Sequence, residues 1–480
     1  MERRWEYLHG DEFWALMEKE PIAWVPVGIL EHHNGHLPWG LDGLKAHGVC
    51  HHLAERLGGV VLPDHQLAGV HGDGWVTDPE RKQHCGQRGL FLYTEATFRR
   101  LLLETFDSLA NLGFKVIVGY SGHYPKIQIK ILQEAAEEFT ARGGATVLPF
   151  VEPMAFDGEG DHGGKYETSI FRALADDNVR MDHIQEDRTG EPGVYRGQPV
   201  GKTATVEFGE QVIESVEAYF REKIEALLGP VDTGHSGPRT RVTCMTSRGG
   251  DEERQWVRLY GHELFPIIPK EPIAWLPLGI LEEHGNHLPW GLDGLKAHGV
   301  CTRLAKAMGG LVMPAIHLAG IHGNYKGDDE AAWRERMRKF GDLLLSEELF
   351  KTWLVETFDS LGNMGFKVIV AYTGHYPGIQ VRVLEEAAEE YNARGEAKVI
   401  PFAQLMATDG EGDHAGKYET SIFMNIDPDR VRLDAIRDAE GREGFYRGKE
   451  IKSSISKEFG VEALGIIEAW MREAVEKARG

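Results

Sequence analysis

The chain has 480 residues, of which 42% are hydrophobic and 27% are charged, a composition typical of a folded protein with a buried core. This length exceeds that of a typical single domain and suits two or three domains. Asp and Glu number 75 against 53 Lys and Arg, which gives a formal net charge of −22. Such an acidic surface repels nucleic-acid phosphates and anionic lipids, so we expect neither nucleic acid nor membrane as a partner.

The opening residues and the cysteines indicate a cytoplasmic location. No apolar run follows the two arginines of MERRWEYLHG, so we expect no signal peptide. Apolar runs such as residues 22–27 are far too short to span a membrane. The four cysteines, at positions 50, 85, 244 and 301, form no CxxC pair, which is typical of a reducing compartment.

Long segments of the sequence occur twice. PIAWVPVGILEHHNGHLPWGLDGLKAHGVC begins at Pro21, and PIAWLPLGILEEHGNHLPWGLDGLKAHGVC begins at Pro272. Matching segments follow at Glu104 and Glu356, and GEGDHxGKYETSIF comes later in both copies. Because this period is far longer than a solenoid repeat, it indicates a duplicated domain. We predict copy one at residues 1–229, a linker rich in Gly, Pro, Ser and Thr at 230–252, and copy two at 253–480.

Short apolar runs alternate with helical patterns within each copy. In copy one, buried strands are expected at residues 23–30, 60–63, 115–120 and 146–150. Helices are expected at residues 44–57, 95–112 and 127–142. This alternation predicts an α/β fold with a mainly parallel sheet covered on both faces. Ligands of such sheets gather beyond the carboxyl ends of the strands.

Carboxylates and histidines follow the strand ends in both copies. Copy one has Glu31, His33 and Asp42 after its first strand, and further His and Glu residues after later strands. Mixed carboxylate and imidazole ligands suit divalent Zn, Mn or Fe. A bridging carboxylate with two further ligands for each ion would make a two-metal centre. A lone Glu or His here would be read as a core or capping residue, but repetition of the whole set favours metal.

The sequence resembles the creatininase (creatinine amidohydrolase) family over nearly all of each copy. The family signature is Glu-x-His-Gly-x-His-Leu-Pro with a following Asp, then Gly-His, then His-Ala-Gly-x-x-Glu-Thr-Ser. The resemblance implies that the metal ligands are Glu31, His33, Asp42, His123 and Glu167 in copy one and Glu282, His284, Asp293, His375 and Glu419 in copy two. Asp42 and Asp293 would bridge two ions per domain, and His162 and His414 would carry a proton to the leaving group.

The resemblance also implies a fold and an assembly. Family members are layered α/β/α domains that form oligomers, often hexamers. We therefore expect two tandem layered α/β/α domains, each with a mainly parallel sheet flanked by helices. We also expect a homo-oligomer, for which a trimer of two-domain chains would supply six domains.

Some positions depart from the family pattern. Ser121 and Thr373 replace the Asn that usually precedes Gly-His. Pro125 and Pro377 stand where creatininase takes a metal ligand from Glu, so that ligand position would fall to the later Glu of each copy. These changes argue against creatinine itself as the substrate.

Other residues near the ligands are candidates for substrate binding. They are His36, Trp39, Tyr124 and Lys165 in copy one and His287, Trp290, Tyr376 and Lys417 in copy two. Core packing is an alternative role for the two tryptophans, and a solvated position at a helix start is an alternative for the two lysines. The copies differ most at residues 71–98 and 322–350. We therefore expect both metal centres to be intact but their pockets to differ.

Together these features predict a metal-dependent hydrolase acting on a small-molecule substrate. A metal-activated hydroxide would attack the carbonyl of a small, polar, cyclic amide. One alternative is hydrolytic ring opening, at a C–C bond or a lactone, of an oxidised cyclic polyol or sugar such as a keto-inositol. Another alternative is a metal-holding scaffold in which only one copy is active.

Overall fold

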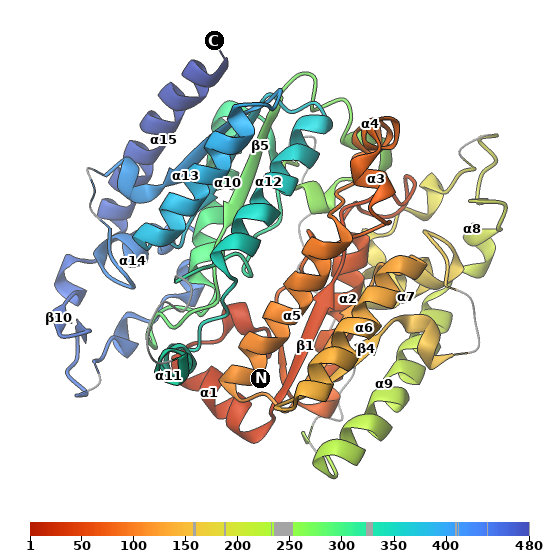
Figure 1. Cartoon of the computed structure of the whole chain (residues 1–480), viewed down its shortest axis with the longest axis horizontal. Coiled ribbons are helices and arrows are strands. Elements are labelled where there is room, and N and C mark those ends of the chain that lie inside the picture. The colour runs from red at the N-terminus through yellow and green to blue at the C-terminus, as the bar shows by residue number, and fades with distance from the viewer. Residues whose placement is uncertain are drawn as a thin grey trace. The chain divides into compact units, whose positions relative to one another are not determined.

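The computed structural model describes residues 1–156, 160–186, 189–231, 233–234, 253–322, 330–408, 410, 412–438 and 440–479 (Figure 1). Most of the predicted linker at 230–252, and residues 323–329 of the variable segment in copy two, lie outside these ranges. The chain forms two compact units. We call them the first unit (Glu20–Phe106 and Phe114–Lys270) and the second unit (Met1–Lys19, Asp107–Gly113 and Glu271–Gly480).

The first unit is built on a parallel four-stranded sheet in the order β2-β1-β3-β4. Its strands are β1 (Ile22–Val27), β2 (Val60–Val61), β3 (Val116–Ser121) and β4 (Thr146–Phe150). Its longer helices are α2 (Leu41–Leu57), α6 (Lys126–Arg142), α7 (Lys165–Ala175), α9 (Val206–Leu228) and the part of α5 (Glu95–Leu112) that precedes Asp107. The shorter helices are α3 (Gly74–Thr77), α4 (Pro79–Gln87) and α8 (Val200–Thr203). The predicted strands and helices of copy one are thus confirmed, with small shifts at their ends.

Helices cover both faces of this sheet. On one face, side chains of α2, α7 and α9 join sheet residues such as Trp24 and Tyr120 in one buried core. On the other face, a side chain added at Gly119 would meet Leu132 of α6 and Phe106 of α5. This arrangement is the expected layered α/β/α fold, and it brings the carboxyl ends of all four parallel strands to one edge.

The second unit repeats the arrangement with the strand order β6-β5-β7-β8. Its strands are β5 (Ile273–Leu278), β6 (Leu311–Val312), β7 (Val368–Thr373) and β8 (Lys398–Ala403), with a hairpin of β9 (Phe445–Tyr446) and β10 (Lys449–Glu450). Its helices are α1 (Gly10–Lys19), α10 (Leu292–Met308), α11 (Glu330–Phe340), α12 (Glu347–Asn363), α13 (Gly378–Asn392), α14 (Lys417–Phe423) and α15 (Lys457–Arg479). In the described part of the chain, no helix combines the length and apolar character that crossing a bilayer requires.

The opening segment of each sequence copy belongs to the compact unit of the other copy. In the first unit, the backbone N–H of Trp39 donates to the carbonyl of Leu259 (2.8 Å). In the second unit, the backbone N–H of Trp290 donates to the carbonyl of Leu8 at the same distance. The two copies have therefore exchanged their first residues, which the sequence repeat does not reveal. The division into residues 1–229, 230–252 and 253–480 remains a description of the sequence copies.

Candidate metal centres

The loop after the first strand of each copy turns sharply to present its Glu and His. Asn34 has a φ of 65°, and Gly285 at the matching position of copy two has a φ of 69°. Glycine and asparagine adopt this left-handed conformation more readily than other residues. The turn places His33 and His284 so that each ring Nδ1 donates to the carbonyl of the preceding metal-site glutamate, Glu31 or Glu282 (3.0 Å in both copies).

The Gly-His segment after β3 lies against the start of α2. A Cβ atom on Gly122 would lie 2.1 Å from the carbonyl oxygen of Asp42, so only glycine allows this approach. The same close approach joins Gly374 and Asp293. The Ser121 hydroxyl, at the position where the family usually has Asn, donates to the carbonyl of His123 and steadies this turn. The approach brings His123 beside the first-turn carboxylate of α2.

Five predicted ligands of copy one converge in the buried cluster. His123 Nδ1 lies 2.9 Å from Glu31 Oε1 and 3.2 Å from Asp42 Oδ2. His33 Nε2 lies 3.2 Å from Asp42 Oδ1 and 3.7 Å from Glu167 Oε2. Asp42 therefore directs one oxygen to each half of the cluster, which is the position of a bridging carboxylate.

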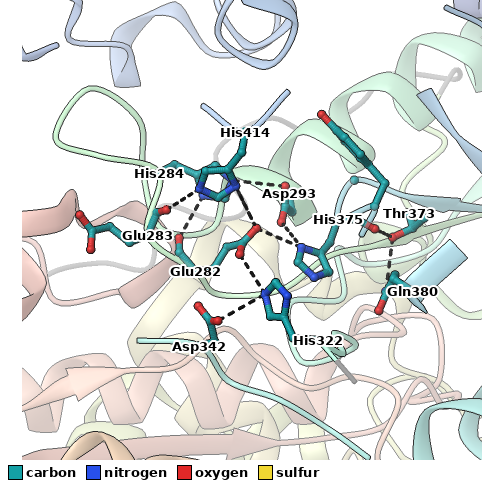
Figure 2. A network of polar contacts seen from close by, with 12 residues as sticks. Glu282, Glu283, His284, Asp293, His322, Asp342, Thr373, His375, Gln380 and His414 are labelled. Carbon is teal, nitrogen blue, oxygen red and sulfur yellow. Dashed lines mark hydrogen bonds and ion pairs between the residues drawn. The ribbon is translucent and has the colours of Figure 1, made fainter. Parts of the chain in front are cut away.

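The cluster of copy two has the same geometry (Figure 2). His375 Nδ1 lies 3.0 Å from Glu282 Oε1 and 3.2 Å from Asp293 Oδ2. His284 Nε2 lies 3.5 Å from Asp293 Oδ1 and 3.7 Å from Glu419 Oε2. Two complete clusters with matched distances argue that neither copy has lost its ligand set.

The polar atoms of these clusters fit a divalent cation. Because Nδ1 of His33 donates to a carbonyl, a neutral ring directs the lone pair of Nε2 at the surrounding carboxylates. That Nε2 and both carboxylate oxygens of Asp42 are buried without a hydrogen-bond partner among the described residues. A lone pair facing carboxylates is repulsive unless a cation lies between them. The mixed His and carboxylate donors suit Zn, Mn or Fe.

The pKa values of the cluster reflect the same concentration of charge. Burial lowers the pKa of His33, but the negative charges of Asp42 and Glu167 outweigh burial and raise it to about 9. Burial also lowers the pKa of His123, and Glu31 and Asp42 raise it to about 10. Burial raises the pKa of Glu31, yet the histidines beside it hold that pKa well below its usual range. The cluster therefore favours a positive charge, either protons or a metal ion.

Buried groups fix the carboxylate of Glu167. Lys45 Nζ donates to its Oε1 (3.0 Å), and the backbone N–H of Gly163 donates to its Oε2 (2.7 Å). Lys45 also lies 3.1 Å from Glu152. In copy two Lys296 donates to Oε1 of Glu419 in the same way, at 2.5 Å. Copy two has Gln404 at the position of Glu152, and its lysine lies 3.9 Å from a second carboxylate, that of Asp293.

The predicted proton carriers stand beside the clusters. His162 Nε2 donates to the carbonyl of His32 (2.8 Å), and its Nδ1 lies 3.4 Å from Glu31 Oε1. Its ring stacks on that of His33, with centroids 4.4 Å apart. His414 makes the matching contacts in copy two, where its Nδ1 lies 3.5 Å from Glu282 Oε1. In both copies the backbone contact engages Nε2, while Nδ1 lies on the side of the metal-site glutamate.

One histidine per copy joins the cluster although it was not among the predicted site residues. His71 Nε2 lies 3.8 Å from Glu31 Oε2, and Glu31, His71 and His123 together form a group able to hold a metal ion. His322 Nε2 lies 3.3 Å from Glu282 Oε2 in copy two. The signal was available, because both histidines stand at matching places in the two copies, in the segments LAGVHG and LAGIHG.

A cavity opens onto each cluster, with a volume of about 700 Å³ in copy one and about 410 Å³ in copy two. Tyr124 and Tyr376 line these cavities, as predicted for substrate-binding residues. Each phenol donates to the carbonyl of a neighbouring aspartate, Asp161 or Asp413. Phe265, from the exchanged opening segment of copy two, also lines the cavity of copy one.

Other residues predicted to bind substrate lie away from the cavities. Trp39 and Trp290 are fully buried among aromatic rings, so they pack in the core. His36 and His287 are buried too: His36 contacts the Thr168 hydroxyl, and His287 donates to the carbonyl of Ala415.

The lysines at the starts of α7 and α14 also turn away from the cavities. Lys165 Nζ lies 3.5 Å from the centroid of the Phe208 ring, and Lys417 Nζ is equally close to Phe459. The aromatic faces of α9 and α15 attract these charges, so neither side chain is among the residues that line a cavity.

The fold and the clusters together define a class of protein. Each unit is a layered α/β domain with a candidate metal centre at the carboxyl edge of its parallel sheet. The family model described as creatinine amidohydrolase matches residues 6–224 and again residues 262–466. The chain therefore belongs to the creatinine amidohydrolase (creatininase) family, as a tandem duplication of the family domain.

Individual relatives are distant. A creatinine amidohydrolase from Pseudomonas putida is 26% identical over 185 residues, which are 35% of this chain and 68% of the relative. A mycofactocin precursor peptide peptidase from Mycobacterium ulcerans (strain Agy99) is 26% identical over 170 residues, which are 34% of this chain and 62% of the relative.

Solved structures of creatininases also match. A crystal structure of a creatinine amidohydrolase (creatininase) is 22% identical, with a TM-score of 0.36, and the match covers 47% of this chain and 97% of that one. A putative creatinine amidohydrolase from Bacteroides fragilis is 19% identical, with a TM-score of 0.34, and the match covers 45% and 91%. Other matched creatininase structures are a Mn form and a Zn-Zn type mutant.

Proposed function

We propose that the chain is a metal-dependent hydrolase with one binuclear centre per copy, acting on the amide of a small, polar, cyclic molecule. The observation that carries this proposal is the convergence of Glu, His, Asp, His and Glu in a buried cluster that occurs twice with matched distances. Membership of the creatinine amidohydrolase family supports the reaction class.

The residues divide into two groups around each bridging aspartate. Glu31, His123 and Asp42, with His71 beside them, would hold one ion, and His33, Asp42 and Glu167 would hold the other. Zn, Mn or Fe held there would supply Lewis acidity and activate water for attack on a carbonyl carbon. Lys45 and the N–H of Gly163 hold the Glu167 carboxylate in place beside the cluster.

His162 and His414 are suited to carry a proton during the reaction. Each ring donates from Nε2 to a carbonyl, so a neutral ring offers Nδ1 as a base beside the metal-site glutamate. Nδ1 can take the proton of the attacking water and then give it to the amide nitrogen as the C–N bond breaks. Both histidines line their cavities, where a bound substrate would lie.

The cavity sizes favour a small substrate. Volumes of about 700 and 410 Å³ fall within the range of pockets that bury small molecules, about 300–1,000 Å³. The phenols of Tyr124 and Tyr376 form part of the polar lining. Their oxygens already donate to carbonyls, so they present a fixed oxygen to a substrate N–H.

Paired variants test the proposal. The double variant His162→Gln and His414→Gln should keep the metal content of the wild type and lose about 10²–10⁴-fold in kcat on a cyclic amide or ureide that the wild type hydrolyses. His183→Gln, which changes an exposed histidine, is the matched control and should leave both unchanged. Wild-type protein that binds no divalent metal at equilibrium would contradict the proposal.

A further inference from the structure

The two cavities differ in charge although their ligand clusters match. The residue after the metal-site glutamate is His32 in copy one and Glu283 in copy two. Leu90 of copy one corresponds to Asp342 of copy two. All four residues line the cavity of their own copy, so each replacement changes the surface that a substrate meets.

Arginines supply the charge in the cavity of copy one. Arg88 and Arg196 both line it, and Arg88 is exposed at the surface of the unit. Guanidinium groups present planar pairs of donors that match a carboxylate, and they keep their charge at any working pH.

A buried carboxylate changes the cavity of copy two. Asp342 is only 5% exposed, and its Oδ2 lies 3.3 Å from Nε2 of His322 (Figure 2). Its Oδ1 has no hydrogen-bond partner among the described residues, although it belongs to a residue that lines the cavity. A buried acceptor without a donor is unfavourable, so a ligand that brings an N–H is stabilised there.

Glu283, the second acidic residue specific to copy two, offsets the positive charge of the arginine in this cavity. Arg447 of copy two corresponds to Arg196 of copy one, but it faces Glu283 in place of a histidine. Glu283 and Arg447 line the same cavity, so their opposite charges partly cancel there. The residues specific to copy two therefore make its cavity the more negative of the two.

We infer that the two cavities take substrates of opposite charge: the cavity of copy one takes a small molecule that carries a carboxylate, and the cavity of copy two takes one that carries a basic nitrogen. Arg88 and Arg196 would bind the carboxylate, and Asp342 and Glu283 would bind the ammonium or amidinium group. The inference rests on the proposed function, because it assigns substrate classes to the same two centres.

Three hydroxamates of equal length test this inference on the full, metal-loaded chain. Succinic acid monohydroxamate has an anionic tail, butyrohydroxamic acid a neutral tail, and β-alanine hydroxamate a cationic tail, while all share a metal-binding head. Titration calorimetry should show about two neutral hydroxamates per chain. Each charged hydroxamate should fill one high-affinity site, with its second site about tenfold weaker or more, because a unit charge near a cavity carboxylate or guanidinium contributes about that much.

Variants then assign the sites. Asp342→Leu with Glu283→His should weaken the tight site for β-alanine hydroxamate about tenfold and spare that for the succinic compound. Arg88→Glu should weaken the tight site for the succinic compound and spare that for β-alanine hydroxamate. Arg142→Glu, which makes the same charge change on an exposed part of α6, is the control and should alter neither. Equal affinity of both sites for each charged compound would overturn the inference alone, whereas failure of the neutral compound to bind would overturn the proposed function with it.

Discussion

Because the two copies exchange their opening segments, mutating a buried tryptophan in the opening segment of one copy should affect the ligand loop of the other copy. Trp256 lies in sequence copy two, yet its ring packs in the first unit, 5.6 Å from Phe91 and 6.4 Å from Trp39. Trp5 lies in copy one, yet it packs in the second unit, with its ring 6.1 Å from that of Trp290. Both are 0% exposed. Trp256→Ala should therefore loosen the ligand loop of copy one, and Trp5→Ala that of copy two.

The size of the effect follows from burial and from the backbone pairing of the segments. Truncating a fully buried tryptophan to alanine costs about 3–5 kcal/mol, because it removes apolar burial and leaves a cavity. The segment of Trp256 also holds Trp39 through a backbone hydrogen bond from Trp39 to Leu259 (2.8 Å), and Trp39 in turn accepts from the N–H of Glu31 (3.2 Å). A loss of about 3 kcal/mol corresponds to a more than hundredfold increase in local opening.

Hydrogen exchange measured by mass spectrometry reads this opening without any need for metal or substrate. In Trp256→Ala, amides of residues 28–45 should exchange about a hundredfold faster, while amides of residues 279–296 stay close to the wild type. Trp5→Ala should give the opposite pattern. Faster exchange at 279–296 in Trp256→Ala, with residues 28–45 unchanged, would refute the exchanged arrangement.

Three further predictions follow from the clusters. In metal-free protein, the raised pKa values of His33 and His123 stabilise the fold fully below pH 6.5, and this contribution is lost as the pH rises through about 9 and 10. Urea unfolding should therefore show a lower free energy of unfolding at pH 10 than at pH 7. A higher free energy of unfolding at pH 10 would contradict this prediction. Lys45→Met leaves two buried carboxylates, Glu152 and Glu167, without a cation that lies within 3.1 Å of both, and should cost about 3–5 kcal/mol of stability. Lys296→Met removes one close contact, to Glu419, and one long contact of 3.9 Å, to Asp293, and should cost less; equal losses in urea titrations would count against this account. Asp42→Asn and Asp293→Asn should each remove about half of the bound metal, and the double variant should remove all of it together with turnover, as elemental analysis and an activity assay would show.

The fold was accessible from the sequence because its signals are local. Runs such as residues 116–121 are apolar throughout and lie between helical patterns, so they predict the buried strands of a parallel sheet. The predicted ligands converge for a related reason. Glu31 and His123 follow neighbouring strands, β1 and β3, whose carboxyl ends meet at one edge.

Other features depend on contacts that no local pattern encodes. The exchange of opening segments leaves the repeat unchanged, because each copy keeps a full set of elements whichever unit receives its first residues. Lys165 stands next to the predicted site in sequence, but the ring of Phe208, more than forty residues later, draws its side chain away. Asp342 and Leu90 lie in the variable segments, where sequence comparison predicted a difference between the pockets without indicating its charge. The predicted homo-oligomer and its trimeric form remain predictions.

The central claim is that each copy holds its own binuclear centre, and metal content tests it most directly. Protein saturated with Zn or Mn, freed of loosely bound ions and measured by elemental analysis should contain about four ions per chain, and Asp42→Asn should retain about two. A wild-type content of about two ions that Asp42→Asn leaves unchanged would contradict the claim, because the cluster of copy one would then hold no metal despite its complete set of ligands.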